Sequence, residues 1–75
     1  MDRFELTHWL RLTLTPGVGS GSARSLLGRF GLPEVVFAQS AQALRAVVGP
    51  TRGDALRQVP DGFDTQLQRT WDWLH

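Results

Sequence analysis

The sequence predicts an all-α domain, a compact bundle of five to six short helices. No stretch alternates apolar and polar residues as a strand does, whereas several segments repeat apolar residues every three or four positions. Glycine or proline separates most of these segments, as is typical of helix ends. At 75 residues the chain makes one domain with a modest core.

The first helix is expected to follow Asp2, because Asp2 and Glu5 have the spacing of a capping box. Pro16 and Gly17 end it. His8 falls on or beside its polar side and is interpreted as an ordinary surface histidine. The face expected to point to the core consists of Leu6, Trp9, Leu10 and either Thr13 or Leu14.

A second helix is expected to begin near Ser20 to Ser22 and to end at Gly31 in a left-handed cap. Its apolar positions have ideal helical spacing, and its other side carries polar and small residues. The predicted core face holds Ala23, Leu26, Leu27 and Phe30, and the opposite face holds Arg24, Ser25, Gly28 and Arg29.

Two short helices are predicted next. Pro33 suits the first position of a helix over 32–37, and Ser40 is expected to cap the following one. In that following helix Ala41, Leu44 and Val48 line up, and Gly49-Pro50 breaks it.

Thr51 is expected to cap a further short helix that runs to Arg57. After Pro60 a last helix should start at Asp61, where Asp61 and Asp64 serve as capping and dipole-stabilising carboxylates rather than a catalytic pair. Its buried stripe is predicted to be Phe63, Leu67, Thr70 or Trp71, and Leu74. Since this helix runs directly to the chain end, we expect residues 1–75 to be a fragment of a longer protein.

Composition narrows the function classes. All eight basic residues are arginine, the formal net charge is +1 and there is no cysteine. Arginine suits phosphate, but the missing lysines are read as a compositional bias, so charge alone does not predict nucleic-acid binding. The first residues lack the basic-then-apolar order of a signal peptide, and the sequence has no apolar stretch of about 20 residues, no metal-ligand pattern and no placed catalytic base. We expect a cytoplasmic, non-enzymatic protein without cofactor or membrane contact.

The segment from Pro16 to Ala23 is the most informative motif. Three glycines within five residues precede an amphipathic helix, and such a turn can place free amides at a phosphate. A Walker loop is excluded by the absence of lysine and of a strand, and a dinucleotide fingerprint by Ser22 and the surrounding helical pattern. A flexible Gly-Ser linker is a minor alternative. A turn that only joins two packed helices stays open.

Residues 14–27 resemble the signature of helix-hairpin-helix modules: Leu-x-Pro-Gly-Val-Gly, then Ala four residues on and Leu-Leu after it. The resemblance implies that amides of the turn contact DNA phosphates without reading sequence. On this chain the implied contacts are Val18, Gly19 and Gly21, with Ser22 and Arg24 nearby.

A weaker echo of the motif covers residues 47–56 and suggests two hairpins related by pseudo-symmetry. Pro50 lacks an amide hydrogen where the pattern has a donor, so phosphate binding by this second turn is doubtful. Arg52 and Arg57 are the secondary DNA-binding candidates here, through their side chains.

Nearly the whole chain is similar to the amino-terminal domain of the DNA-processing protein A (DprA/Smf) family. The similarity is carried by Trp9-Leu10-Arg11-Leu12 and by the segments 26–31, 35–40 and 44–49. It implies a SAM-like tandem helix-hairpin-helix domain that precedes a Rossmann-like domain. That second domain binds single-stranded DNA and helps to load the RecA recombinase during natural transformation.

By this resemblance the helical domain is a non-catalytic accessory module whose partners are DNA, its own downstream domain and, through the full-length protein, a RecA-type recombinase. The competing hypothesis is a protein-interaction or self-association module without DNA contact. Trp73, which falls off the buried stripe, is interpreted as an interdomain contact rather than a base-stacking residue.

Overall fold

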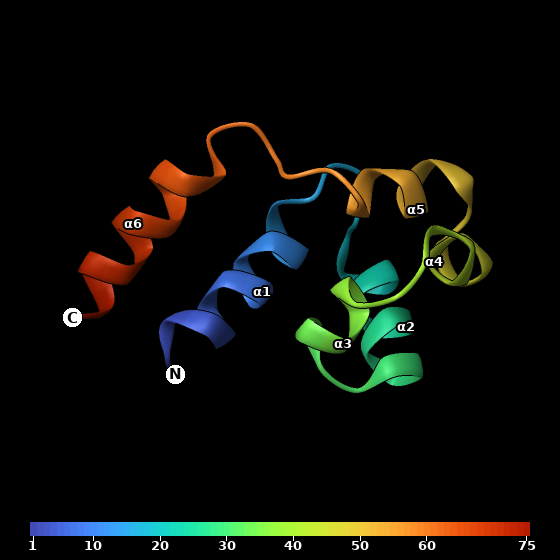
Figure 1. The fold of residues 1–75 in the computed structure, drawn as a ribbon, viewed down its shortest axis with the longest axis horizontal. Coiled ribbons are helices and arrows are strands. Elements are labelled where there is room, and N and C mark those ends of the chain that lie inside the picture. Colours follow the sequence, from blue (N-terminus) through green and yellow to red (C-terminus); the bar gives the residue numbers. More distant parts are fainter.

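The computed structural model describes residues 1–75 and contains six helices and no strands, with 73% of the residues helical (Figure 1). The all-α prediction is therefore confirmed. None of the helices combines the length and apolarity that a membrane crossing requires. In chain order the helices are α1 (Arg3–Leu14), α2 (Ser20–Phe30), α3 (Pro33–Phe37), α4 (Ala41–Val48), α5 (Pro50–Leu56) and α6 (Phe63–Leu74).

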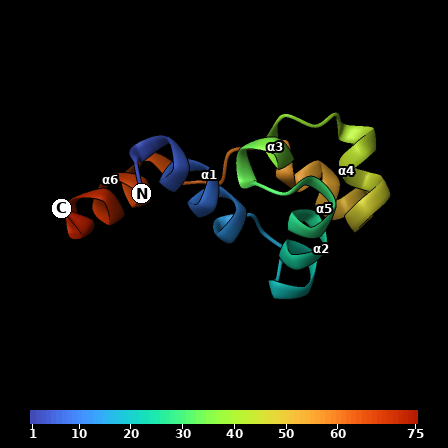
Figure 2. The same cartoon turned by 90° about the horizontal axis from the view of Figure 1, so that it is seen from below.

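Two separate hydrophobic clusters hold these helices together, and α1 contributes to both. The main core packs α1 against the four helices α2, α3, α4 and α5. Its buried residues, one from each helix, are Leu12, Leu26, Val36, Leu44 and Leu56. The smaller cluster joins α1 to α6 through Leu6, Phe63 and Leu67. Figure 2 accordingly shows α6 beside α1 at one end and α2 to α5 grouped at the other, and the molecule measures 37 × 23 × 20 Å.

Most predicted helix ends are confirmed. The Glu5 amide donates to Asp2 Oδ1 at 2.7 Å while the Asp2 amide donates to Glu5 Oε1 at 3.3 Å, which completes the capping box. Ser40 Oγ accepts from the Ala43 amide at 3.2 Å, and Pro33 is the first residue of α3. Gly31 ends α2 as predicted and has a positive φ, but its φ of +91° and ψ of −62° lie outside the left-handed helical region that was expected. Local capping chemistry therefore defines these four boundaries.

Two predicted helix starts are wrong. Thr51 does not cap α5: Pro50 already begins that helix after Gly49, because the φ of proline is preset for a first helical position. Asp61 does not begin α6, which starts at Phe63. The Phe63 amide instead closes a turn on the Pro60 carbonyl at 3.1 Å, and no side chain caps the helix.

The buried faces of α1 and α6 also differ from prediction. Leu12 is buried although it lies off the predicted stripe, whereas Trp9 and Leu14 are 39% and 36% exposed. The reason is that α1 packs on α3 and on α6 in two different directions. Leu74 of the predicted stripe is 49% exposed, because the smaller cluster contains only the first part of α6 and Trp71.

The most closely packed helix pair is α4 and α5, which form the second hairpin of the weak internal repeat at residues 47–56. Gly53 is buried at the crossing, and a Cβ there would lie 2.9 Å from the backbone N and Cα of Arg45. Arg45 Nη2 also forms an ion pair with Asp54 Oδ1 at 2.6 Å, with both side chains about half exposed. Close packing at glycine therefore defines this hairpin.

Candidate functional site at the glycine turn

The turn between α1 and α2 is closed by its own backbone. Thr15 is buried, and both its amide and its hydroxyl donate to the Arg11 carbonyl, at 3.1 and 2.7 Å. Gly17 follows with a φ of +81°, a conformation that side chains with a Cβ adopt only under strain. The Val18 amide then donates to the Thr15 carbonyl at 3.2 Å. These bonds fix the direction in which α2 begins.

The side chain of Val18 connects the turn to the main core. Its amide is already used by Thr15, and its half-buried side chain packs against the main core. The resemblance assigned Val18 a phosphate contact through the turn. The structure places this residue where it holds the turn in position, with its donor directed at the protein.

The next amides have no acceptor in the protein. Gly19 is the N-cap of α2 and no side chain caps the helix, so the first intrahelical bond is Ala23 N to Gly19 O at 2.9 Å. The amides of Ser20, Gly21 and Ser22 therefore stay free at the positive end of the helix dipole. The first turn contains no acidic residue.

The surface over these amides is open. A Cβ at Gly19 or Gly21 would meet nothing within 4 Å, so a bulky ligand can approach the backbone. Arg24 follows in the next turn of α2, exposed and without a hydrogen bond or ion pair to the protein. Free amides, a positive dipole end and an unpaired guanidinium together can hold an oxyanion such as a phosphate.

The structure brings the second turn against the first. Arg52 Nε donates to the Gly17 carbonyl at 2.8 Å. A depression of about 420 Å³ lies between the two turns, lined from Gly17 on one side and 48–52 on the other. Arg52, a secondary candidate from the sequence, thus belongs to the same site as Gly17.

Two other candidates lie elsewhere. Arg57 donates to the Gln39 carbonyl at 2.9 Å and lines a separate pocket with Arg11. Trp73 is 84% exposed on α6, at the end of the molecule formed by α1 and α6 (Figure 2). Neither residue is part of the surface at the glycine turn.

Sequence reasoning missed a groove beside the turn. It has a volume of about 350 Å³ and lies between α1 and α2, with Trp9, Leu12 and Val18 among its apolar walls and Gly19 at its rim. Trp9 was expected in the core and lines this groove instead. The signal in the sequence is Trp9, a large aromatic residue on the helix that leads into the glycine turn.

The two histidines lie against aromatic rings. His8 Nδ1 is 2.8 Å from the Phe4 carbonyl oxygen, and its ring centroid is 4.5 Å from that of Phe4. The ring of His75 lies 4.0 Å from that of Trp71. His8 is thus partly covered rather than a free surface histidine.

Comparison of the chain with protein-family models, with curated proteins and with solved structures gives no match. The turn is held by the hydrogen bonds of Thr15 and by the backbone of Gly17. It has open space at Gly19 and Gly21, and Arg52 joins it to the second turn.

Proposed function

We propose that residues 1–75 form a non-catalytic accessory DNA-binding domain that contacts the DNA backbone without reading the base sequence. The observation that carries this proposal is the row of free amides at Ser20, Gly21 and Ser22, which begins an eleven-residue helix. A DNA phosphate is the ligand that fits them best, because it supplies several acceptor oxygens and a negative charge to the positive end of the helix.

The surroundings of these amides support a phosphate over a neutral acceptor. No carboxylate in the first turn of α2 competes for the positive potential, and Arg24 adds a charged donor nearby. Arg52 lies against Gly17 and brings a second guanidinium to the edge of the turn. These groups recognise backbone charge and present no side-chain pattern suited to base edges.

The wider role follows from the resemblance to the DprA/Smf family. On that basis the domain belongs to a DNA-processing protein that handles single-stranded DNA and loads RecA during natural transformation. The main DNA and recombinase contacts then belong to a downstream Rossmann-like domain. The helical domain adds weak phosphate contacts, with dissociation constants on the order of 10⁻⁴ to 10⁻⁶ M at physiological salt.

The test is fluorescence anisotropy with labelled single- and double-stranded oligonucleotides at low salt. A Gly21→Asp variant places a carboxylate among the free amides. The helix dipole stabilises this carboxylate, and its negative charge repels a DNA phosphate. Thr65→Asp is the matched control, since it adds the same charge near the start of α6 at an exposed position. We expect Gly21→Asp to weaken binding several-fold and Thr65→Asp to leave it unchanged. Equal binding by both variants and the unmodified domain would exclude this site.

A second candidate function is protein association through α6. Trp73 is 84% and Leu74 49% exposed, and tryptophan is enriched at protein interfaces. Sedimentation over a range of concentrations tests it with Trp73→Ala. Loss of self-association in that variant supports an interface at α6, and a monomer at every concentration contradicts self-association.

A further inference from the structure

A second basic site lies away from the glycine turn. Arg11 of α1 and Arg57, which follows α5, line a pocket of about 240 Å³ whose other walls are Phe37, Leu44 and Leu56. The three apolar residues belong to α3, α4 and α5, so four helices meet around two guanidinium groups. This pocket shares no lining residue with the groove or the depression at the turn.

Both guanidinium groups are held in place by backbone carbonyls. Arg11 Nη2 donates to the Leu56 carbonyl at 3.2 Å, and its guanidinium carbon lies 4.6 Å from the centroid of the Phe37 ring. Arg57 Nη1 donates to the Gln39 carbonyl at 2.9 Å. Each guanidinium uses one nitrogen in this way, so further donors of both groups have no protein partner.

The two positive charges have no carboxylate to balance them. The only ion pair in the protein joins Arg45 to Asp54. Burial, and then the charge of Arg57, lower the pKa of Arg11. Arg11 Nε is also buried without any hydrogen-bond partner. Two neighbouring cations beside an apolar wall repel one another, and an anion bound between them would relieve this repulsion.

We propose that the pocket between Arg11 and Arg57 binds a phosphate monoester or free phosphate as a dianion. Such a group carries about −1.5 to −2 charges at neutral pH and three acceptor oxygens, which matches two guanidinium groups better than a single carboxylate does. Guanidinium forks suit phosphate geometry, and the apolar walls strengthen the pairing. This inference does not depend on the DNA contact at the glycine turn.

Inorganic phosphate is the first probe, titrated into the ¹⁵N-labelled domain at constant ionic strength while the side-chain Nε–H signals of both arginines are followed. We expect saturable shifts of the Arg11 and Arg57 signals. Thymidine 5′-monophosphate and the thymidine dinucleotide diester form two further arms. A response to inorganic phosphate alone identifies free phosphate as the occupant, and a response to the monophosphate but a weaker one to the diester identifies a terminal phosphate.

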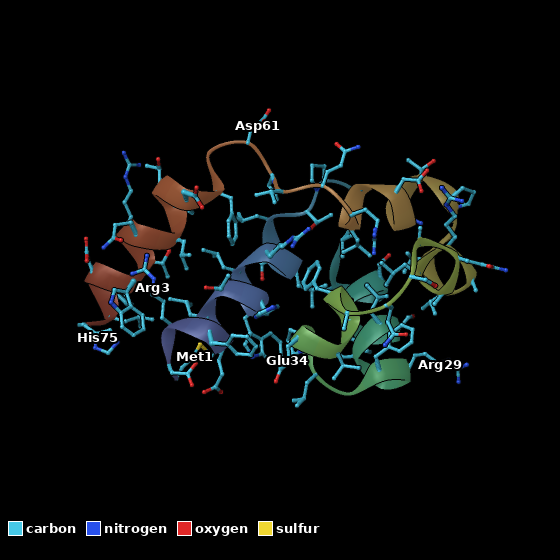
Figure 3. All side chains as sticks on the ribbon, in the orientation of Figure 1. Met1, Arg3, Arg29, Glu34, Asp61 and His75 are labelled. Carbon is cyan, nitrogen blue, oxygen red and sulfur yellow. The ribbon has the colours of Figure 1, made fainter.

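Variants decide whether the pocket is responsible. Because Arg57 is exposed, Arg57→Gln should leave the fold intact. The variant should weaken phosphate binding roughly tenfold, because it removes a charged hydrogen-bond donor. Arg29→Gln removes the same charge from an exposed position near the end of α2, away from the pocket and from both glycine turns (Figure 3), and should leave the response unchanged. Absence of any arginine shift with phosphate, an equal response to acetate, or an unchanged response in Arg57→Gln would each overturn the assignment. Unchanged amide spectra outside the pocket establish that each variant is folded.

Discussion

Arg52 Nε donates to the carbonyl oxygen of Gly17 at 2.8 Å, and this bond joins two turns that are 35 residues apart in the chain. One turn begins α2 and the other begins α5, so the helix pairs of the sequence echo meet at their glycine turns. The bond gives the Gly17 carbonyl a charged hydrogen-bond donor from α5.

Replacing Arg52 tests how far this bond holds the first turn. Arg52→Gln should lower the free energy of unfolding by about 0.5–1 kcal/mol and speed hydrogen exchange at the Val18 amide, which closes the turn. Arg29→Gln serves as the control, because Arg29 is an exposed arginine near the end of α2. Exchange rates at Val18 that are equal in the two variants would show that Arg52 does not stabilise the turn.

Gly17 should resist substitution for a backbone reason. Gly17→Ala is expected to destabilise the domain by about 1–2 kcal/mol, since a Cβ at φ +81° is strained even though the nearest atom is 3.8 Å away. Gly28→Ala changes the same atoms inside α2 and should stabilise by about 0.5–1 kcal/mol. Thermal and urea unfolding measure both. A neutral Gly17→Ala would mean that the turn tolerates another backbone conformation.

Gly53 should be sensitive because of packing. Its backbone conformation is helical, but an added Cβ would overlap the Arg45 backbone at 2.9 Å, so α4 and α5 would have to separate. We expect Gly53→Ala to cost about 1–3 kcal/mol, in the range of overpacked core substitutions. Denaturant unfolding checks this, and a stability equal to that of the unmodified domain would contradict such a close crossing.

The capping box at the start of α1 provides a local test. Asp2→Ala removes the acceptor of the Glu5 amide and should destabilise by about 1 kcal/mol, whereas Asp2→Asn keeps an acceptor and should change stability less. Thermal unfolding of the two variants distinguishes them. If Asp2→Ala leaves the unfolding midpoint unchanged, the first turn of α1 is already frayed in solution.

Features governed by neighbouring residues could be predicted from the sequence. The capping pairs at Asp2 and Ser40, the proline at the start of α3 and the core face of α2 all depend on contacts within a few positions. The free amides at the glycine turn also have a local origin: Gly19 has no side chain that could cap the first turn of α2.

Features governed by distant segments could not be predicted. Periodicity assigns one buried face to α1, but two separate clusters cover it, so Leu12 is buried and Trp9 is left at a groove. Arg52 and Arg57 form one pair of secondary DNA-binding candidates in the sequence, yet Arg52 reaches Gly17 and Arg57 shares a pocket with Arg11. Such pairings depend on how the helices meet, which no local pattern contains.

The most direct test of the proposed DNA contact is an NMR titration of the isolated domain with single- and double-stranded DNA at low salt. The amide signals of Gly19, Ser20, Gly21 and Ser22 are predicted to shift in a saturable way and to return as salt is added. The Val18 amide, which donates to Thr15, should shift less than these four. If these four signals stay fixed through the titration, the glycine turn does not bind DNA and the proposed function is wrong.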